Sequence, residues 1–265
     1  MEADDYNKQA WNSGAYQAWV KRFGTPEQAA GRLKRNPAKV IRHLSGHFGN
    51  EVQGRRMMNL MGSNGMKAVA LALLGAEVTV VDFSDENRLY AEALAGAAGV
   101  DLRYVLSDVL QLPEEEFRFS YDIVFMENGI LHYFKDLKPL FDCAAGLLSP
   151  GGRLVVQDFH PVSTKLITST GSTAKIRKHK VTGDYFNTAL EASEVSYQKY
   201  LDTDQRNDQQ AVYLRKWTLG EIVTAVAASG LMVKTLEEMP NLSSEVYDKG
   251  IPKTFIISAE KANYK

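Results

Sequence analysis

The sequence predicts an α/β protein built on a parallel sheet that helices cover on both faces. Between residues 56 and 160, short apolar runs alternate with segments of helical spacing. These runs are hydrophobic nearly throughout, which is typical of parallel strands buried on both faces. The chain has 265 residues, 45% of them hydrophobic, so it is long enough to bury a full core around such a sheet.

The predicted elements follow one another in a regular order. We expect strands at 57–61, 77–82, 102–106, 121–126 and 153–158, and helices at 66–74, 85–98 and 135–148. Further along, the helical segment LGEIVTAVAASG has Gly230 as a plausible stop and is followed by strands LMVKTLEE and KTFIISAEK. These last elements complete the sheet.

A helical extension precedes the sheet. Residues 4–50 show helical spacing in two pieces, in which Trp11, Ala15 and Trp19 recur at every fourth position. The segment Gly24-Thr25-Pro26 is expected to end one helix and start the next. We therefore treat residues 1–55 as an N-terminal helical extension or lid.

An insertion interrupts the sheet. Residues 161–217 contain no crossover helix followed by a strand, but polar turns, the basic run KIRKHK at 175–180 and the alternating pattern EVSYQKYL at 194–201. We expect residues 161–216 to form an inserted substrate cap, and residues 56–160 and 217–265 to form the core.

Composition excludes some classes of function. Lys and Arg total 31 and Asp and Glu total 32, so no global field would attract nucleic acid or an anionic membrane. Cys143, the only cysteine, is predicted to be a buried thiol, which agrees with a reducing compartment. No signal peptide or apolar run of membrane-spanning length is visible, so we expect a cytoplasmic protein. The pair His43 and His47 has metal-ligand spacing but no partnering Glu or Cys, and we predict no metal site.

The turn after the first predicted strand is a candidate ligand site. In open α/β sheets a ligand binds beyond the carboxyl ends of the strands, where the strand order reverses. In NLMGSNG, at 59–65, Gly62 and Gly65 would let the backbone approach a ligand, although two glycines can also serve the turn alone.

Two acidic residues extend this candidate site. Asp82 ends the second strand and could accept hydrogen bonds from both hydroxyls of a ribose. The alternative is a helix-capping role for Asp82, for which Ser84 is better placed. Asp108, in LSDVLQLP after the third strand, could accept from an exocyclic amine, with the Val109 N–H as donor to a ring nitrogen. Together these residues would bind an adenosine.

In this order of features the chain resembles the class I S-adenosylmethionine-dependent methyltransferases, whose first loop has the pattern acidic-x-Gly-x-Gly-x-Gly. Gly65 takes the last glycine position, Ser63 the middle one, Met61 the first, and Asn59 the acidic one. The segments LLSPGGRLVVQDF and PKTFIISAEK are similar to the family's fifth strand and its antiparallel seventh strand.

The resemblance implies a doubly wound, Rossmann-like sheet of seven strands, mostly parallel with an antiparallel last strand. It also implies S-adenosyl-L-methionine as cofactor. The Met61 thioether would lie against the methionine portion, and Asn59 would offer a neutral hydrogen bond near the ammonium group. The predicted cofactor residues are Tyr16, Met61, Gly62, Ser63, Gly65, Asp82, Phe83, Asn87, Ser107, Asp108, Val109, Glu127 and Asn128.

The acceptor would enter beside the fourth strand. The segment MENGILHYF places Glu127 and Asn128 at the crevice, unless they only cap the following turn. His132 and His160 are the candidate bases, and a purely structural histidine is at least as common. Tyr16 is the better N-terminal candidate for a contact with the sulfonium, because Trp11 and Trp19 share a stripe that anchors the helix.

The cap would supply the second wall of the acceptor site, through Tyr185 and Phe186, and its residues Lys175, Arg177, Lys178 and Lys180 would attract an anionic acceptor or form a solvated face.

We expect an enzyme that methylates an oxygen or nitrogen of a small molecule by in-line displacement, as monomer or homodimer. An NAD-dependent oxidoreductase is the enzymatic alternative, because Asp82 would also suit NAD. A non-catalytic module that binds S-adenosylmethionine is the third, because the glycine loop is irregular.

Overall fold

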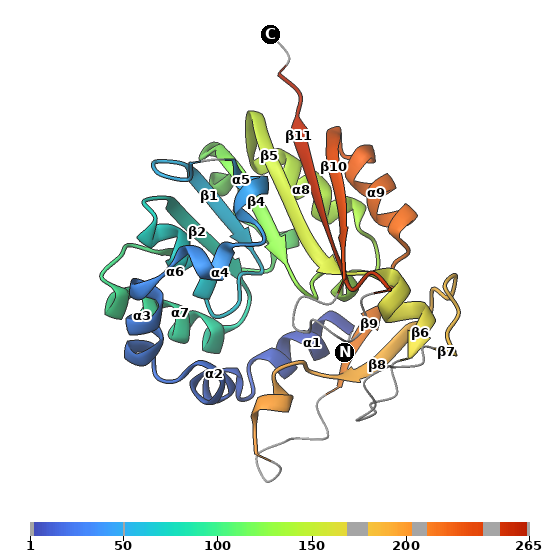
Figure 1. Cartoon of the computed structure of the whole chain (residues 1–265), viewed down its shortest axis with the longest axis horizontal. Coiled ribbons are helices and arrows are strands. Elements are labelled where there is room, and N and C mark those ends of the chain that lie inside the picture. Colours follow the sequence, from blue (N-terminus) through green and yellow to red (C-terminus); the bar gives the residue numbers. More distant parts are fainter. Residues whose placement is uncertain (1–2, 50, 169–179, 203–210, 241–249, 264–265) are drawn as a thin grey trace.

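A seven-stranded sheet forms the centre of the protein (Figure 1). The computed structural model describes residues 3–49, 51–168, 180–202, 211–240 and 250–263. The sheet order is β10-β11-β5-β4-β1-β2-β3. The strands are β1 Arg56–Leu60, β2 Glu77–Asp82, β3 Arg103–Leu106, β4 Tyr121–Glu127, β5 Leu148–Phe159, β10 Leu231–Met239 and β11 Thr254–Lys261.

The direction of the strands confirms the predicted fold class. β1 to β5 pair in parallel, whereas β11 is antiparallel to both of its neighbours, β5 and β10. Strand order reverses at β1, which lies between β2 and β4. The carboxyl ends of these strands therefore surround a switch point of the kind that binds ligands in doubly wound sheets.

Helices cover both faces of the sheet, and each face has its own apolar core. One core contains Met57, Ile123 and Phe125 with residues of α3, α6 and α7. The other contains Met58, Val124 and Met126 with residues of α8 and α9. Successive residues of a strand alternate between the two cores because strand side chains point to opposite faces. These helices are α3 Pro26–Arg35, α6 Met66–Leu73, α7 Asp85–Ala98, α8 Lys138–Leu147 and α9 Leu219–Ala228.

Local capping explains the bounds of α7, which are those predicted. Ser84 is its N-cap, and the Ser84 hydroxyl accepts a hydrogen bond from the Asn87 N–H at 3.2 Å. Gly99 ends the helix in the left-handed conformation, with φ of 74°. By contrast, α8 begins at Lys138 rather than at the predicted residue 135. Leu137 is its N-cap, and the Asp136 carboxylate before it accepts from the Lys138 N–H at 2.9 Å.

The N-terminal segment differs from its prediction. It forms five short helices: α1 Ala3–Trp11, α2 Ala15–Phe23, α3, α4 Ala38–Ile41 and α5 Ser45–Phe48. Trp11 and Trp19 do not share one helix, because the chain breaks at Gly14, where φ is 120°. Their rings nevertheless stack with centroids 6.3 Å apart, so tertiary packing restores the contact that helical spacing predicted.

The segment between β5 and α9 forms small hairpins beside the sheet. It contains a π-helix at Val162–Leu166, then β6 Ile167–Thr168 paired with β7 Lys180–Val181, and β8 Leu190–Glu194 paired with β9 Ala211–Arg215. The alternating pattern at 194–201 is not a strand, because β8 ends at Glu194 and a 3-10 turn follows at Gln198–Tyr200. Lys175, Arg177 and Lys178 lie outside the described residues.

Figure 1 places α1 and the β8–β9 hairpin at the end of the sheet toward which the parallel strands point. Within the part of the chain that the structure describes, no helix combines the length and the apolar character needed to cross a bilayer.

Candidate cofactor and acceptor site

The loop between β1 and α6 keeps an unusual backbone. Met61, Ser63 and Gly65 all have positive φ, at 51°, 50° and 71°. These are the three positions that the sequence matched to glycines, and two of them hold residues with a Cβ. The left-handed conformation costs such residues roughly 1–2 kcal/mol each, so the surrounding structure stabilises this loop shape. At Gly62, a Cβ would lie 2.6 Å from the Asn59 Oδ1, which leaves room only for glycine.

Asp82 joins this loop to the start of α7. One carboxylate oxygen accepts from the Ser63 N–H at 3.0 Å, and the other accepts from the Ser84 N–H at 2.9 Å and the Asn87 amide at 3.2 Å. Burial raises the pKa of Asp82, and these hydrogen bonds oppose that shift. Both oxygens are already engaged, so ribose hydroxyls would have to share or replace these partners.

Asn87 and Phe83 lie beside Asp82. The Asn87 side chain is buried, donates to Asp82 and accepts from the Trp19 indole N–H at 2.8 Å, so it orients Asp82 from behind. Phe83 is half-buried at the end of the same strand.

The turn after β3 brings the predicted adenine residues next to β2. The Ser107 N–H donates to the Asp82 carbonyl at 3.0 Å, and the Asp108 carboxylate caps a short 3-10 helix by accepting from the Leu110 N–H at 2.9 Å. Val109 is buried, and its carbonyl accepts from the Cys143 thiol at 3.4 Å. Burial raises the pKa of Cys143 to about 11, and Asp108 adds to the shift.

The structure adds a charged pair that sequence reasoning missed. Lys67, in the first turn of α6, forms an ion pair with the carboxylate of Glu127, at the end of β4. Burial lowers the pKa of Lys67 to about 8. The neighbouring Asn128 is exposed and has φ of 55°, and its N–H donates to the Gln157 carbonyl at 2.7 Å. A lysine two residues after the last loop glycine was the available signal for Lys67.

Asp158 fixes the loop that follows β4. This buried carboxylate at the end of β5 accepts from four backbone N–H groups, those of Gly129, Ile130, Leu131 and Phe159, at 2.6 to 3.1 Å. The sequence predicted Asp158 only as the end of a strand, because carboxylates that accept from a distant loop leave no local pattern.

His132 lies in the loop that Asp158 holds. Its ring packs against Tyr133 with centroids 4.6 Å apart. The ring also lies close to Gly129, because a Cβ added at Gly129 would be 3.3 Å from the His132 Cε1. Burial lowers the pKa of His132, while Asp158 opposes the shift. A lowered pKa keeps the imidazole neutral near pH 7, which is the protonation state that a general base needs.

The other candidate base, His160, does not fit that role. Its ring nitrogens are both engaged, because Nδ1 accepts from the Val162 N–H at 3.1 Å and Nε2 lies 2.6 Å from a carboxylate oxygen of Glu238. The side chain is buried beside Phe255 at the β10–β11 side of the sheet. His160 therefore fastens the turn after β5, and His132 remains the candidate base.

The N-terminal helices attach directly to the site. The Trp11 indole N–H donates to the Tyr133 hydroxyl at 3.1 Å, and the Ser84 hydroxyl donates to the Trp11 carbonyl at 2.9 Å. The Tyr16 ring instead packs on Tyr90 of α7, with centroids 5.7 Å apart. Trp11, rather than Tyr16, reaches the loop after β4, and a cofactor contact of Tyr16 stays a prediction.

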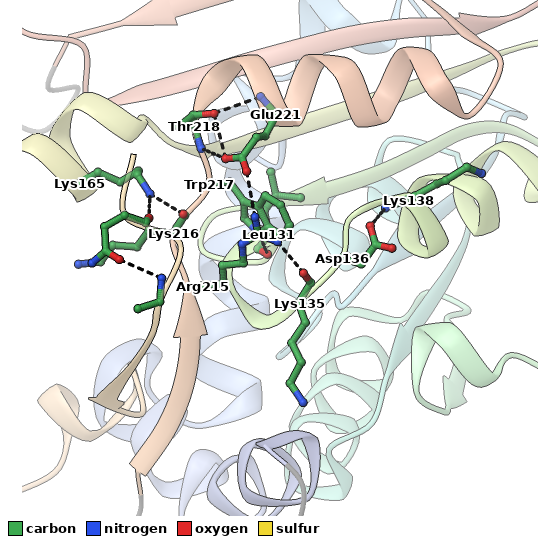
Figure 2. A network of polar contacts seen from close by, with 12 residues as sticks. Leu131, Lys135, Asp136, Lys138, Lys165, Arg215, Lys216, Trp217, Thr218 and Glu221 are labelled. Carbon is green, nitrogen blue, oxygen red and sulfur yellow. Dashed lines mark hydrogen bonds and ion pairs between the residues drawn. The ribbon is translucent and has the colours of Figure 1, made fainter. Parts of the chain in front are cut away.

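Arg215 of the inserted segment and Trp217, which follows that segment, also hold this loop, as Figure 2 shows. The Arg215 guanidinium donates to the Lys135 carbonyl at 2.7 Å and to Glu221 at 2.9 Å, and it stacks 3.5 Å from the Trp217 ring centroid. The Trp217 indole N–H donates to the Leu131 carbonyl at 2.9 Å. The loop after β4 is thus fastened by three separate parts of the chain.

The remaining cap residues lie nearby. The Tyr185 hydroxyl accepts from the Leu219 N–H at 3.1 Å, whereas the Phe186 side chain is 80% exposed. The buried Lys165 ammonium donates to the carbonyls of Asn187 and Lys216 at 2.6 and 2.7 Å, which joins the two hairpins of the cap (Figure 2).

His43 and His47, which have metal-ligand spacing in the sequence, contact different residues. His43 Nε2 accepts from Arg42 at 2.8 Å, while His47 Nε2 lies 3.1 Å from Glu237. In the described ranges, no group of three or more His, Cys, Asp and Glu side chains is placed to hold a metal ion.

Comparisons with known proteins identify similar methyltransferases. Residues 61–156 match the model of a family described as a methyltransferase domain. The demethylmenaquinone methyltransferase of Clavibacter sepedonicus is 32% identical over 117 residues, which cover 44% of this chain and 46% of that protein. The ribosomal RNA large subunit methyltransferase K/L of Shewanella oneidensis is 29% identical over 147 residues, 50% of this chain and 20% of that protein. The chain thus spans less than two thirds of the length of these relatives.

A solved structure extends the similarity to nearly the whole chain. Magnesium protoporphyrin IX methyltransferase from Synechocystis PCC 6803, with S-adenosylhomocysteine bound, superimposes with a TM-score of 0.60 at 14% identity. The superposition covers 98% of this chain and 100% of the Synechocystis enzyme. At this identity the likeness concerns the fold.

Proposed function

Because the chain carries a class I S-adenosylmethionine-dependent methyltransferase domain, we propose that it transfers a methyl group from S-adenosylmethionine to an oxygen or nitrogen of a small molecule. The observation that carries the proposal is the left-handed loop of Met61, Ser63 and Gly65, tied to Asp82 at the switch point of the sheet. The buried Ser63 hydroxyl has no hydrogen-bond partner among the described residues, as expected of an atom that meets a polar ligand.

The predicted residues would hold the cofactor in a row along the carboxyl edge. Asp108 and the Val109 N–H would bind the adenine, Asp82 the ribose, and the loop at 61–65 the amino-acid portion, with Gly62 allowing close approach. When bound, the cofactor supplies an electrophilic methyl group on a sulfonium. The chain's own contribution is to align the acceptor with that group and to exclude water, since in-line displacement needs little else from the protein.

His132 would take the proton from an acceptor hydroxyl. It lies in the loop after β4, beside the switch point, and its lowered pKa favours the neutral imidazole. Asp158 would position this loop by accepting from its backbone N–H groups. Trp11 and Trp217, which bind the loop from opposite ends of the chain, would close the site around a small acceptor.

A small molecule is favoured over RNA by charge. The formal net charge of −1 provides no global field for a polyanion, and nucleic-acid binding relies on neutralising phosphates with Lys and Arg. The demethylmenaquinone and magnesium protoporphyrin IX methyltransferases are named for small-molecule acceptors, and the similarity covers 46% and 100% of their lengths. The similarity to the ribosomal RNA methyltransferase covers 20% of that protein.

A thermal-shift assay tests cofactor binding. S-adenosylhomocysteine at a hundred times its dissociation constant should stabilise the protein by roughly 2.7 kcal/mol, or about 5–10 °C for a chain of this size. NAD should give no shift. In Asp82→Asn the shift should shrink strongly, whereas the control Asp85→Asn, which changes an exposed acid three residues further along at the start of α7, should keep it. A full shift with NAD, or none with S-adenosylhomocysteine, would overturn the proposal.

Turnover separates an enzyme from a cofactor-binding module. His132→Gln should lower methyl transfer to a hydroxyl acceptor by about 10²–10⁴-fold, the usual contribution of a general base, without changing the affinity for S-adenosylhomocysteine. His160→Gln should keep transfer within a few-fold. Acceptor panels should include phenols, catechols and amines, with transcribed RNA as the negative arm.

A further inference from the structure

The charged pair at the switch point suggests how the amino-acid end of the cofactor is recognised. The strand order β3, β2, β1, β4 places the proposed adenine, ribose and loop contacts one after another along the carboxyl edge. Neighbouring strands lie about 4.8 Å apart. A ligand that begins at Asp108 and passes Asp82 therefore ends above β1 and β4, where Lys67 and Glu127 lie.

The last polar side chain of β1 cannot supply a charge there. Asn59 is neutral and buried, and its amide donates to the Phe125 carbonyl at 3.4 Å. Phe125 pairs with Asn59 in the sheet register, and Glu127 follows two residues later on the same strand. The carboxylate nearest the loop thus comes from β4 rather than from β1.

Lys67 occupies a position that helix stability does not favour. The first turn of a helix carries a partial positive charge, so a lysine there is destabilising relative to an acid. α6 has no acidic residue in its first turn that would offset this effect. The Lys67 and Glu127 side chains are only 21% and 13% exposed, so both charges have also lost much of their hydration. A pair placed against these two penalties is better explained by a ligand than by folding.

We propose that Lys67 and Glu127 form a two-point receptor for the zwitterionic amino-acid group of the cofactor, with Lys67 binding the α-carboxylate and Glu127 the α-ammonium. This inference rests on the proposed function. In the ligand-free protein the two side chains neutralise each other. On binding, each exchanges its partner for the opposite charge of the ligand, so no buried charge is left unpaired at either stage.

The receptor makes a selective prediction, because an adenosine without the amino-acid group leaves the ion pair intact. We would measure dissociation constants by isothermal titration calorimetry for S-adenosylhomocysteine and for 5′-methylthioadenosine, which lacks that group. In Lys67→Met and Glu127→Gln, the affinity for S-adenosylhomocysteine should fall at least tenfold, while that for 5′-methylthioadenosine changes less than threefold.

A charge-swapped protein distinguishes recognition from folding. The double variant Lys67→Glu with Glu127→Lys keeps an ion pair, so a purely structural pair would leave binding of both ligands unchanged. We expect the swapped protein to fold and bind 5′-methylthioadenosine but to lose at least tenfold in affinity for S-adenosylhomocysteine. The matched control is Lys138→Met with Asp142→Asn, which removes an exposed lysine–carboxylate pair between positions four residues apart at the start of α8.

The outcomes separate the two proposals. Equal losses for both ligands, or unchanged binding of S-adenosylhomocysteine by the swapped protein, overturn the receptor while the cofactor assignment stands. If the wild-type protein binds neither ligand, the proposed function fails, and the receptor fails with it.

Discussion

Asp158 offers the sharpest test of how the site is held. Its two carboxylate oxygens accept from four backbone N–H groups, three of them in the loop after β4, and the side chain is 4% exposed. In Asp158→Asn, one oxygen becomes an NH₂ group that can only donate. Two of the four N–H groups then lose their acceptor altogether, and the other two keep only a neutral one. Losing a hydrogen bond to a charged group costs about 1.5–3 kcal/mol. We therefore expect the free energy of unfolding to fall by about 3–6 kcal/mol.

Asp136 provides a matched control in the same loop. Its exposed carboxylate accepts from a single N–H, that of Lys138, at 2.9 Å. Because asparagine keeps a carbonyl oxygen that can accept from this exposed N–H, Asp136→Asn should cost less than about 1 kcal/mol.

The measurement for both variants is urea unfolding followed by tryptophan fluorescence, with the slope m compared to confirm that the midpoint reports stability. A loss in Asp158→Asn that is no larger than in the control would refute the argument that this carboxylate organises the loop.

Three further predictions concern other contacts of the site. The pKa of Cys143 is about 11, so only about one molecule in a thousand carries the thiolate at pH 8. Labelling of Cys143 with a thiol reagent should therefore be roughly a hundredfold slower in native than in urea-unfolded protein. Equal labelling rates would show that the thiol is not buried. Since this pKa is raised by folding, the stability that the neutral thiol contributes should be lost as the pH rises from about 9 to about 11. Trp11→Phe keeps an aromatic ring but removes the indole hydrogen bond to Tyr133, so unfolding free energy should drop by about 0.5–1.5 kcal/mol; an unchanged urea midpoint would contradict this. In Arg215→Lys, a lysine cannot keep the hydrogen bonds to the Lys135 carbonyl and to Glu221 while stacking on the Trp217 ring, so the melting temperature should fall. The control Arg88→Lys, at an exposed ion pair, should change the melting temperature little.

Local patterns were enough for the core of the fold. Asp85–Ala98 was predicted with its observed bounds, because Ser84 and Gly99 cap it from adjacent positions in the chain. The strands from Glu77 to Asp82 and from Leu231 onward were predicted by continuous apolar or alternating runs. The matched positions of the glycine loop also correspond to the left-handed backbone at Met61 and Ser63.

Contacts between distant residues were beyond such patterns. Helical spacing put Trp11 and Trp19 on one helix, whereas Gly14 breaks the helix and the two rings meet through packing. The same spacing favoured Tyr16 over Trp11 as a site residue, but the Trp11 indole reaches Tyr133, 122 positions further along the chain. The sequence does not distinguish His160 from His132 as a base. The structure does, because Glu238 of another strand contacts the ring of His160.

The sequence by itself determined the α/β core, the carboxyl edge at which we propose that the ligand binds, and the acids Asp82 and Asp108 along it, since periodicity, capping and strand ends are local properties. Only the tertiary structure decided which side chains share that edge. Lys67 meets Glu127, and Asp158 holds the loop of His132, because parallel strands far apart in the chain end side by side. The burial that gives these charges their energetic weight exists only once the two faces of the sheet are covered.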